Sequence, residues 1–195
     1  MTSTEKDNGV EKIEALPFDI TSITEQWKDP WIVFNFFRTS DHKYFIMTYE
    51  SEVRMCTYWG GIIIFDKVGE MIFDPKQLGT YVPHRNFFYN SKSQSLIYKF
   101  VYLVRKDDDS THNYDYTMFI DIEKQRFAII NKPYARFFDH FTDKSIYFKE
   151  KTDLFGNECT NNIAGSILIS DLENKYFEFS DIETVNERIN KMIDE

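Results

Sequence analysis

Short apolar runs separated by tight polar turns constrain the fold of this sequence more than any other feature. Three stretches have the same design, and their turns are expected at Lys67-Val68-Gly69, at Glu123-Lys124 and near Glu173-Asn174. Runs of β-branched and aromatic residues bounded by such turns predict β-hairpins. The stretches recur at intervals of about fifty residues, a spacing also found in propeller blades. The segments between them do not match, so ordinary hairpins in a meandering sheet explain the pattern better.

The remaining apolar runs extend this prediction. The clearest strand is SLIYKFVYLVRK, residues 95–106, in which Tyr98, Phe100 and Tyr102 alternate with residues of the opposite face. Between Trp31 and Asp74, further runs predict a meander with a short link at Ser51-Glu52. A longer polar and aromatic connection is expected over Pro75–Lys92.

Three helices are expected beside the strands. A short one starts with the capping-box pair Ser22 and Glu25 and ends before Pro30. A second is expected over NKPYARFFDHFTDK, residues 131–144, where aromatic residues recur at helical spacing. The third covers the C-terminus after Ser180. The sequence therefore predicts a mainly β, α+β domain with an antiparallel meander sheet, either open or closed into a barrel or half-barrel.

The length suits one globular domain, expected over residues 13–195 after a flexible N-terminus of residues 1–12. Aromatic residues make up 17% of the chain, which is too much apolar bulk for a disordered protein. The net charge of -9 argues against nucleic acid and anionic membranes as partners, and favours a protein with a basic surface.

Chemical signatures are sparse. Cys56 and Cys159 lie far apart and form no zinc motif, so they are expected to be free thiols in a cytoplasmic protein, or one long-range disulfide. No signal peptide, membrane-spanning run or nucleotide-binding, metalloprotease or serine-hydrolase motif is present, and no cofactor or metal is predicted. A calcium site in the segment 107–111 lacks the glycine that its turn needs.

The segment RKDDDSTHNYDY, residues 105–116, is the strongest candidate site. From Asp107 through Glu123 there are six acids and no lysine or arginine. Carboxylates that steer a partner, beside tyrosines that supply contact area, are typical of protein interfaces. A hairpin loop that only contacts solvent has the same composition, so this alternative stays open. The candidate binding residues are Asp107, Asp108, Asp109, Tyr114, Asp115 and Tyr116.

The leading functional hypothesis is therefore a cytosolic protein that neutralises another protein by occlusion, as immunity proteins and inhibitors neutralise toxins such as nucleases. The alternative is a small-ligand-binding, barrel-like protein, with or without weak enzymatic activity. Its pocket would use His84, Arg85, Tyr98, Phe100 and Tyr102. A structural or regulatory protein of a virus or phage is a third hypothesis. An apolar interior cavity would favour the ligand-binding hypothesis, and a filled interior would favour the interaction hypothesis.

Overall fold

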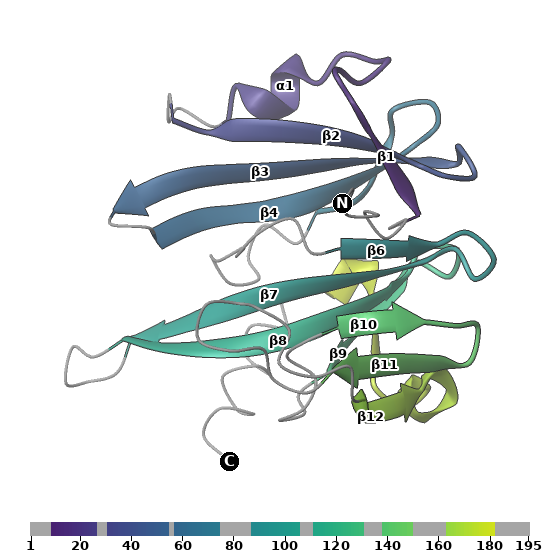
Figure 1. The fold of residues 1–195 in the computed structure, drawn as a ribbon. Coiled ribbons are helices and arrows are strands. Elements are labelled where there is room, and N and C mark those ends of the chain that lie inside the picture. Colours follow the sequence, from purple (N-terminus) through teal and green to yellow (C-terminus); the bar gives the residue numbers. More distant parts are fainter. Residues whose placement is uncertain are drawn as a thin grey trace, which may run out of the picture.

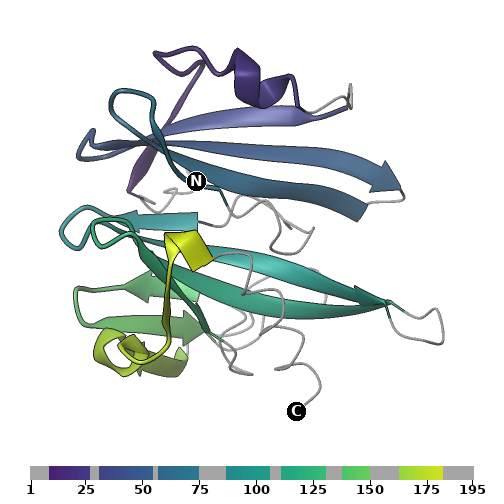
Figure 2. The same cartoon turned by 180° about the vertical axis from the view of Figure 1, so that it is seen from behind.

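The computed structural model describes residues 9–26, 31–54, 57–74, 87–105, 111–130, 138–149 and 163–181. In these residues the protein is built from three antiparallel sheets, two with five strands and one with three. Figures 1 and 2 show the sheets stacked as successive layers, with the five-stranded sheets facing each other. The predicted antiparallel, mainly β architecture is confirmed.

The first sheet is a meander in the order β1-β2-β3-β4-β5. Its strands are β1 (Val10–Ile13), β2 (Val33–Thr39), β3 (Tyr44–Arg54), β4 (Thr57–Asp66) and β5 (Met71–Phe73). β1 lies partly within the segment expected to be a flexible N-terminus. The predicted link at Ser51-Glu52 is wrong, because β3 continues through both residues while paired with β4. The turn predicted at Lys67-Val68-Gly69 does connect β4 to β5.

The second sheet has the order β13-β9-β8-β7-β6. Its strands are β6 (Phe87–Asn90), β7 (Ser95–Arg105), β8 (Thr111–Asp121), β9 (Arg126–Ile130) and β13 (Tyr176–Glu178). The long strand predicted at residues 95–106 and the hairpin turning at Glu123-Lys124 are confirmed. The segment Pro75–Lys92 is more than a connection, since it contains β6.

The third sheet consists of β10 (Phe138–Phe141), β11 (Ser145–Lys149) and β12 (Ile163–Leu168). The helix predicted over residues 131–144 is therefore wrong for its described part. A bulge between Phe138 and His140 explains the misleading spacing. With one extra residue in the strand, Phe138 lies opposite Phe148 and Phe141 lies opposite Ile146, so both phenylalanines belong to one face at i and i+3.

The third predicted hairpin is also wrong. After β12 the chain forms the 3-10 helix η1 (Ile169–Leu172), and β13 then pairs with β9 of the second sheet instead of β12. The apolar pattern identified the strands correctly, but strand pairing depends on contacts distant in sequence. This crossing ties the third sheet to the second.

One α-helix is found in the described part of the chain, α1 (Thr21–Thr24), and it lies beside the first sheet in Figure 1. The predicted Ser22–Glu25 capping box does not form. Instead, an Asp19 carboxylate oxygen accepts hydrogen bonds from the Thr21 backbone N–H and hydroxyl at 2.9 and 2.6 Å. A second 3-10 helix, η2 (Phe179–Asp181), follows β13. The predicted C-terminal helix lies outside the described residues, apart from its first residues in η2.

Buried side chains fill the spaces between the layers. One cluster, which includes Ile46, Ile64, Leu96 and Met118, joins the two five-stranded sheets. A second cluster joins the second and third sheets, and a third covers the outer face of the first sheet beneath the α1 segment. The closed-barrel alternative is wrong for the described strands, because the two five-stranded sheets that they form are open and pack face to face.

Aspartate supplies the turn chemistry at equivalent places in the two large sheets. The Asp66 carboxylate accepts the backbone N–H groups of Val68 and Glu70 at 2.9 and 2.8 Å. Asp121 accepts the N–H of Lys124 at 3.3 Å in the corresponding β8–β9 turn. A carboxylate that bonds backbone two or more residues ahead favours a tight turn, which explains why both hairpins have aspartate at the end of the first strand.

Candidate functional site

The β7–β8 hairpin extends beyond the rest of its sheet. The two strands form eleven residue pairs, from Ser95 with Asp121 to Arg105 with Thr111. β6 pairs with β7 only as far as Tyr98, and β9 pairs with β8 only from Thr117 onward. Residues 100–105 and 111–116 therefore form a two-stranded extension among the described strands, visible at the left of Figure 1. We call this extension the β7–β8 arm.

The predicted partner-binding residues are concentrated at this arm. Tyr114 and Asp115 lie in its β8 strand, opposite Tyr102 and Val101. Asp107, Asp108 and Asp109 lie outside the described residues, in the segment between Arg105 and Thr111.

Tyr116 is at the base of the arm and is only 2% exposed. Its ring belongs to the core between the two large sheets. Tyr116 therefore anchors the arm to the core.

The residues of the predicted alternative pocket are not brought together within the described part of the chain. His84 and Arg85 lie outside it, and Phe100 and Tyr102 are in the β7 strand of the arm. Tyr98 is 4% exposed and packs in the core between the sheets. Burial, with a smaller contribution from Tyr49, raises the pKa of Tyr98, so its hydroxyl stays protonated at neutral pH.

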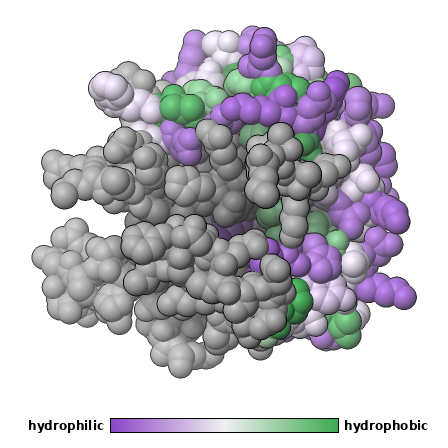
Figure 3. All heavy atoms as spheres, viewed as in Figure 1, coloured by the Kyte–Doolittle hydropathy of each residue, from purple (hydrophilic) through white to green (hydrophobic). Residues whose placement is uncertain are grey.

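An open groove of about 880 Å³ lies at the other end of the β7 strand. Three phenylalanines contribute to it: Phe88 from β6, and Phe138 and Phe141 from β10. The rings of Phe88 and Phe138 have centroids 4.3 Å apart, which joins the second sheet to the third. Lys92 and Lys144 lie among its polar lining residues. Figure 3 shows that hydrophilic residues predominate along the right edge of the described surface.

A small polar network forms one wall of this groove. The Asp139 carboxylate is 2.6 Å from His140 Nδ1 and 3.3 Å from Lys149 Nζ. The His140 ring stacks on Tyr147, with centroids 4.5 Å apart and planes 11° apart. The contacts of Asp139 with Lys149 and of His140 with Tyr147 join β10 to β11.

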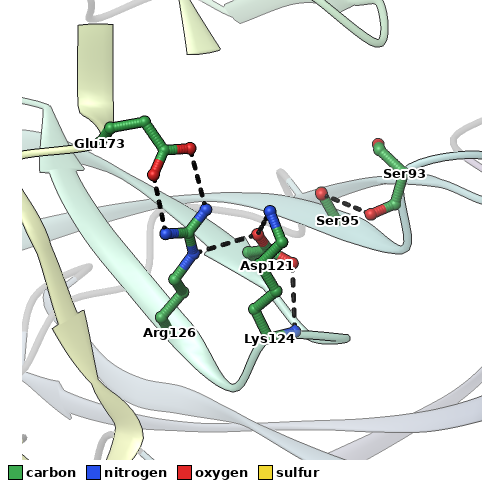
Figure 4. A network of polar contacts seen from close by, with 6 residues as sticks. All are labelled: Ser93, Ser95, Asp121, Lys124, Arg126 and Glu173. Carbon is green, nitrogen blue, oxygen red and sulfur yellow. Dashed lines mark hydrogen bonds and ion pairs between the residues drawn. The ribbon is translucent and has the colours of Figure 1, made fainter. Parts of the chain in front are cut away.

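Arg126 organises a second network, shown in Figure 4. Its guanidinium donates two hydrogen bonds to Glu173, at 2.9 and 3.0 Å, and one to Asp121 at 3.2 Å. It also lies 3.8 Å from the centre of the Tyr176 ring. Hydrogen bonding to Glu173 raises the pKa of Arg126 and lowers the pKa of Glu173. These contacts join β9 to Glu173, the residue after η1, and to β13, so this network has a structural role.

The described ranges contain neither a metal-binding cluster nor a membrane-spanning helix. No group of three or more histidine, cysteine, aspartate or glutamate side chains there is arranged to hold a metal ion. No described helix has the length and apolar character needed to cross a bilayer.

Comparison with known proteins gives no relative from which a function can be transferred. No protein-family model, curated protein or solved structure matches the chain. The site must therefore be interpreted from its own residues.

Sequence reasoning missed the groove altogether. One of its aromatic residues, Phe88, belongs to the adjacent pair Phe87-Phe88 of β6. A second such pair, Phe36-Phe37, lies in β2. This repeated pair of phenylalanines was the available signal, because a pair of adjacent apolar residues in a strand faces two layers at once.

Proposed function

We propose that this protein binds a partner protein with a basic surface and neutralises it by occlusion, in the manner of an immunity protein or inhibitor. The acidic segment at the β7–β8 arm is the binding element. A toxin whose active site is basic, such as a nuclease, is the class of partner that this chemistry fits best.

The observation that carries the proposal is the position of the acidic residues. Four of the six acids between Asp107 and Glu123, namely Asp107, Asp108, Asp109 and Asp115, lie in the arm or in the segment that joins its two strands, and the stretch 107–115 contains no lysine or arginine. The whole chain, including these acids, has a net charge of -9. Such a field accelerates encounter with a basic partner, by roughly 10- to 1000-fold at low salt.

The burial of Tyr98 supports the same proposal. Tyr98, the central residue of the alternative pocket, packs among core side chains. The protein therefore offers its arm as an outward element on a packed scaffold, which suits contact with a macromolecule. A two-stranded arm can enter a concave active site and exclude substrate without taking part in chemistry.

Affinity capture from the cells of origin tests the proposal, with the wild-type chain and two variants compared. In the arm variant, four aspartates become asparagines: Asp107, Asp108, Asp109 and Asp115. In the control variant, four exposed glutamates distant in sequence from the arm become glutamines: Glu14, Glu25, Glu70 and Glu178. Both variants change the net charge equally, so a difference between them reports the position of the charge.

The proposal predicts a stoichiometric, basic partner that is retained by the wild type and the control and lost by the arm variant. Adding the wild-type chain should also inhibit the partner's activity. Recovery of no stoichiometric partner, or equal retention by both variants, would contradict the proposal.

A further inference from the structure

β12 (Ile163–Leu168) is an edge strand with an unusual composition. It pairs with β11 on one side, and none of the described residues pairs with its other side. Its six residues, IAGSIL, contain no charge. Ile163 and Leu168 are 47% and 50% exposed, whereas Ile167 points into the core between the second and third sheets.

Three other sheet edges among the described residues have protective features that residues 165–168 of β12 lack. β1 has Glu11 and Lys12 at its centre, and β10 has Asp139 and His140. β5 is only three residues long. Charges, shortness and bulges are features that hinder an edge from pairing with another chain. β12 has no charge, and its bulge lies at Ala164, outside residues 165–168.

The backbone geometry identifies which β12 residues face outward. The Ile169 N–H donates to the Lys144 carbonyl at 2.8 Å, so position 169 bonds toward β11. Alternation along an antiparallel strand then directs the backbone groups of Gly165 and Ile167 toward β11 as well. The N–H and C=O groups of Ser166 and Leu168 are therefore directed to the open edge. Beyond Gly165 the alternation is interrupted by a bulge at Ala164, because Gly165 lies opposite Phe148 and Ile163 lies opposite Lys149.

We propose that β12 pairs antiparallel with β12 of a second copy of this chain, with the two-fold axis at Ser166. This register centres the new backbone hydrogen bonds on the two opposed Ser166 residues, and the exposed Leu168 of each copy lies across from the bulged end of the other strand, where the small residue Ala164 is found. The product is a continuous six-stranded sheet formed from the two three-stranded sheets.

The uncharged strand is what makes self-pairing feasible in a protein of net charge -9. A charged edge in a symmetric pair sets like charges near one another, and β12 avoids this. Repulsion between the rest of the two copies remains, and salt screens it over about 8 Å at physiological ionic strength. Dimer formation is therefore expected to increase with salt concentration.

Sedimentation velocity over about two orders of magnitude in protein concentration tests the pairing. The wild type is expected to shift from monomer to dimer as concentration rises. Ser166→Pro removes an outward N–H and leaves the bonds to β11 in place, so it is expected to stay monomeric. Circular dichroism establishes that this variant is folded.

A second pair of variants keeps the test decisive if Ser166→Pro does not fold. Ser166→Lys places two lysines directly opposite each other on the two-fold axis and should abolish the dimer, since Ser166 is exposed and like charges on opposed residues repel. Val68→Lys is the matched control, because Val68 is 71% exposed in the β4–β5 turn. A wild type that remains monomeric throughout, or equal effects of the two lysine variants, would overturn the proposal.

Disulfide cross-linking tests the register itself. In a background with Cys56→Ser and Cys159→Ser, Ser166→Cys places two thiols on directly opposed residues, whose Cα atoms are about 5.5 Å apart in a hydrogen-bonded pair. Ala164→Cys places its own copies several residues apart. Rapid cross-linking of Ser166→Cys alone supports the register, and cross-linking of Ala164→Cys alone contradicts it. This dimer is independent of the arm, so either proposal can fail without the other.

Discussion

Truncation of Phe148 is the sharpest test of how the third sheet packs. Phe148 lies in β11, has no exposed surface and belongs to the cluster between the second and third sheets. Its neighbour Tyr147 points to the opposite face of the same strand, where it stacks on His140. Phe148→Ala therefore removes an aromatic ring from the buried face of β11, and Tyr147→Ala removes one from its partly exposed face.

The expected decrease in the free energy of unfolding for Phe148→Ala follows from the complete burial of the Phe148 side chain. Removing a buried phenyl ring loses about 2–3 kcal/mol of transfer free energy, and the unfilled part of the space adds roughly 1 kcal/mol more. The total, about 3–4 kcal/mol, is a large fraction of the 5–15 kcal/mol that stabilises a typical domain. Tyr147→Ala should cost less than about 1 kcal/mol, because its ring lies on the outer face.

Urea denaturation of both variants, followed by tyrosine and tryptophan fluorescence, measures these costs. If the free energy of unfolding falls by about 3 kcal/mol per M of urea, Phe148→Ala should lower the urea concentration at the unfolding midpoint by about 1 M. An unchanged slope shows that the same cooperative unit unfolds. If Tyr147→Ala costs as much as Phe148→Ala, the assignment of the β11 faces is wrong.

Three further substitutions have expected outcomes of different sign. Tyr176→Phe should leave the free energy of unfolding unchanged or raise it by about 1 kcal/mol in chemical denaturation, since the hydroxyl is buried without a hydrogen-bond partner in the described residues. Gly69→Ala should cost about 1–3 kcal/mol by the same assay, because Gly69 has φ +92° and a Cβ would lie 2.6 Å from the Phe18 ring. The hydrogen bond from Arg126 lowers the pKa of Glu173 in the folded protein below its ordinary value of 4.5. The ion pair therefore contributes its full stability above pH 4.5, and this contribution is lost as the pH falls through the pKa of Glu173 in the folded state. Glu173→Gln should therefore flatten the fall of Tm below pH 4.5, and an unchanged slope would exclude the ion pair as its source.

Local patterns predicted the strands of this protein well. β7 was found from its alternation, and the turns after Asp66 and Asp121 were found from their polar residues. These features depend on neighbours in sequence, and strand alternation and turn chemistry are both local. The meander of β1–β5 and the four consecutive strands β6–β9 follow from the same rules, because consecutive strands with short connections usually pair.

The errors arose where distant contacts decide the structure. The bulge in β10 gives Phe138 and Phe141 a helical spacing on one face of a strand. Pairing of β13 with β9 depends on the packing of the third sheet on the second and on the bonds of Arg126 to Glu173. Neither the bulge nor this long-range pairing has a signal within a short window of residues.

The candidate site was predictable only in part. The acidic run at the β7–β8 arm is visible in the sequence, and the base of that arm is anchored by Tyr116, which was expected at an interface. A period-two pattern places a tyrosine on a face of a strand but does not say how far the neighbouring strands extend. Because β9 pairs as far as Thr117, the core reaches Tyr116.

Site-specific photo-cross-linking tests the proposed partner-binding arm most directly. A benzophenone side chain is placed at Tyr114 in one sample and at His140, in the groove, in another, and each is irradiated in cells of origin. The proposal predicts one stoichiometric product at Tyr114, joined to the active-site surface of a basic partner, and none at His140. Cross-linking at His140 alone, or at neither position, would contradict the assignment of partner binding to the β7–β8 arm.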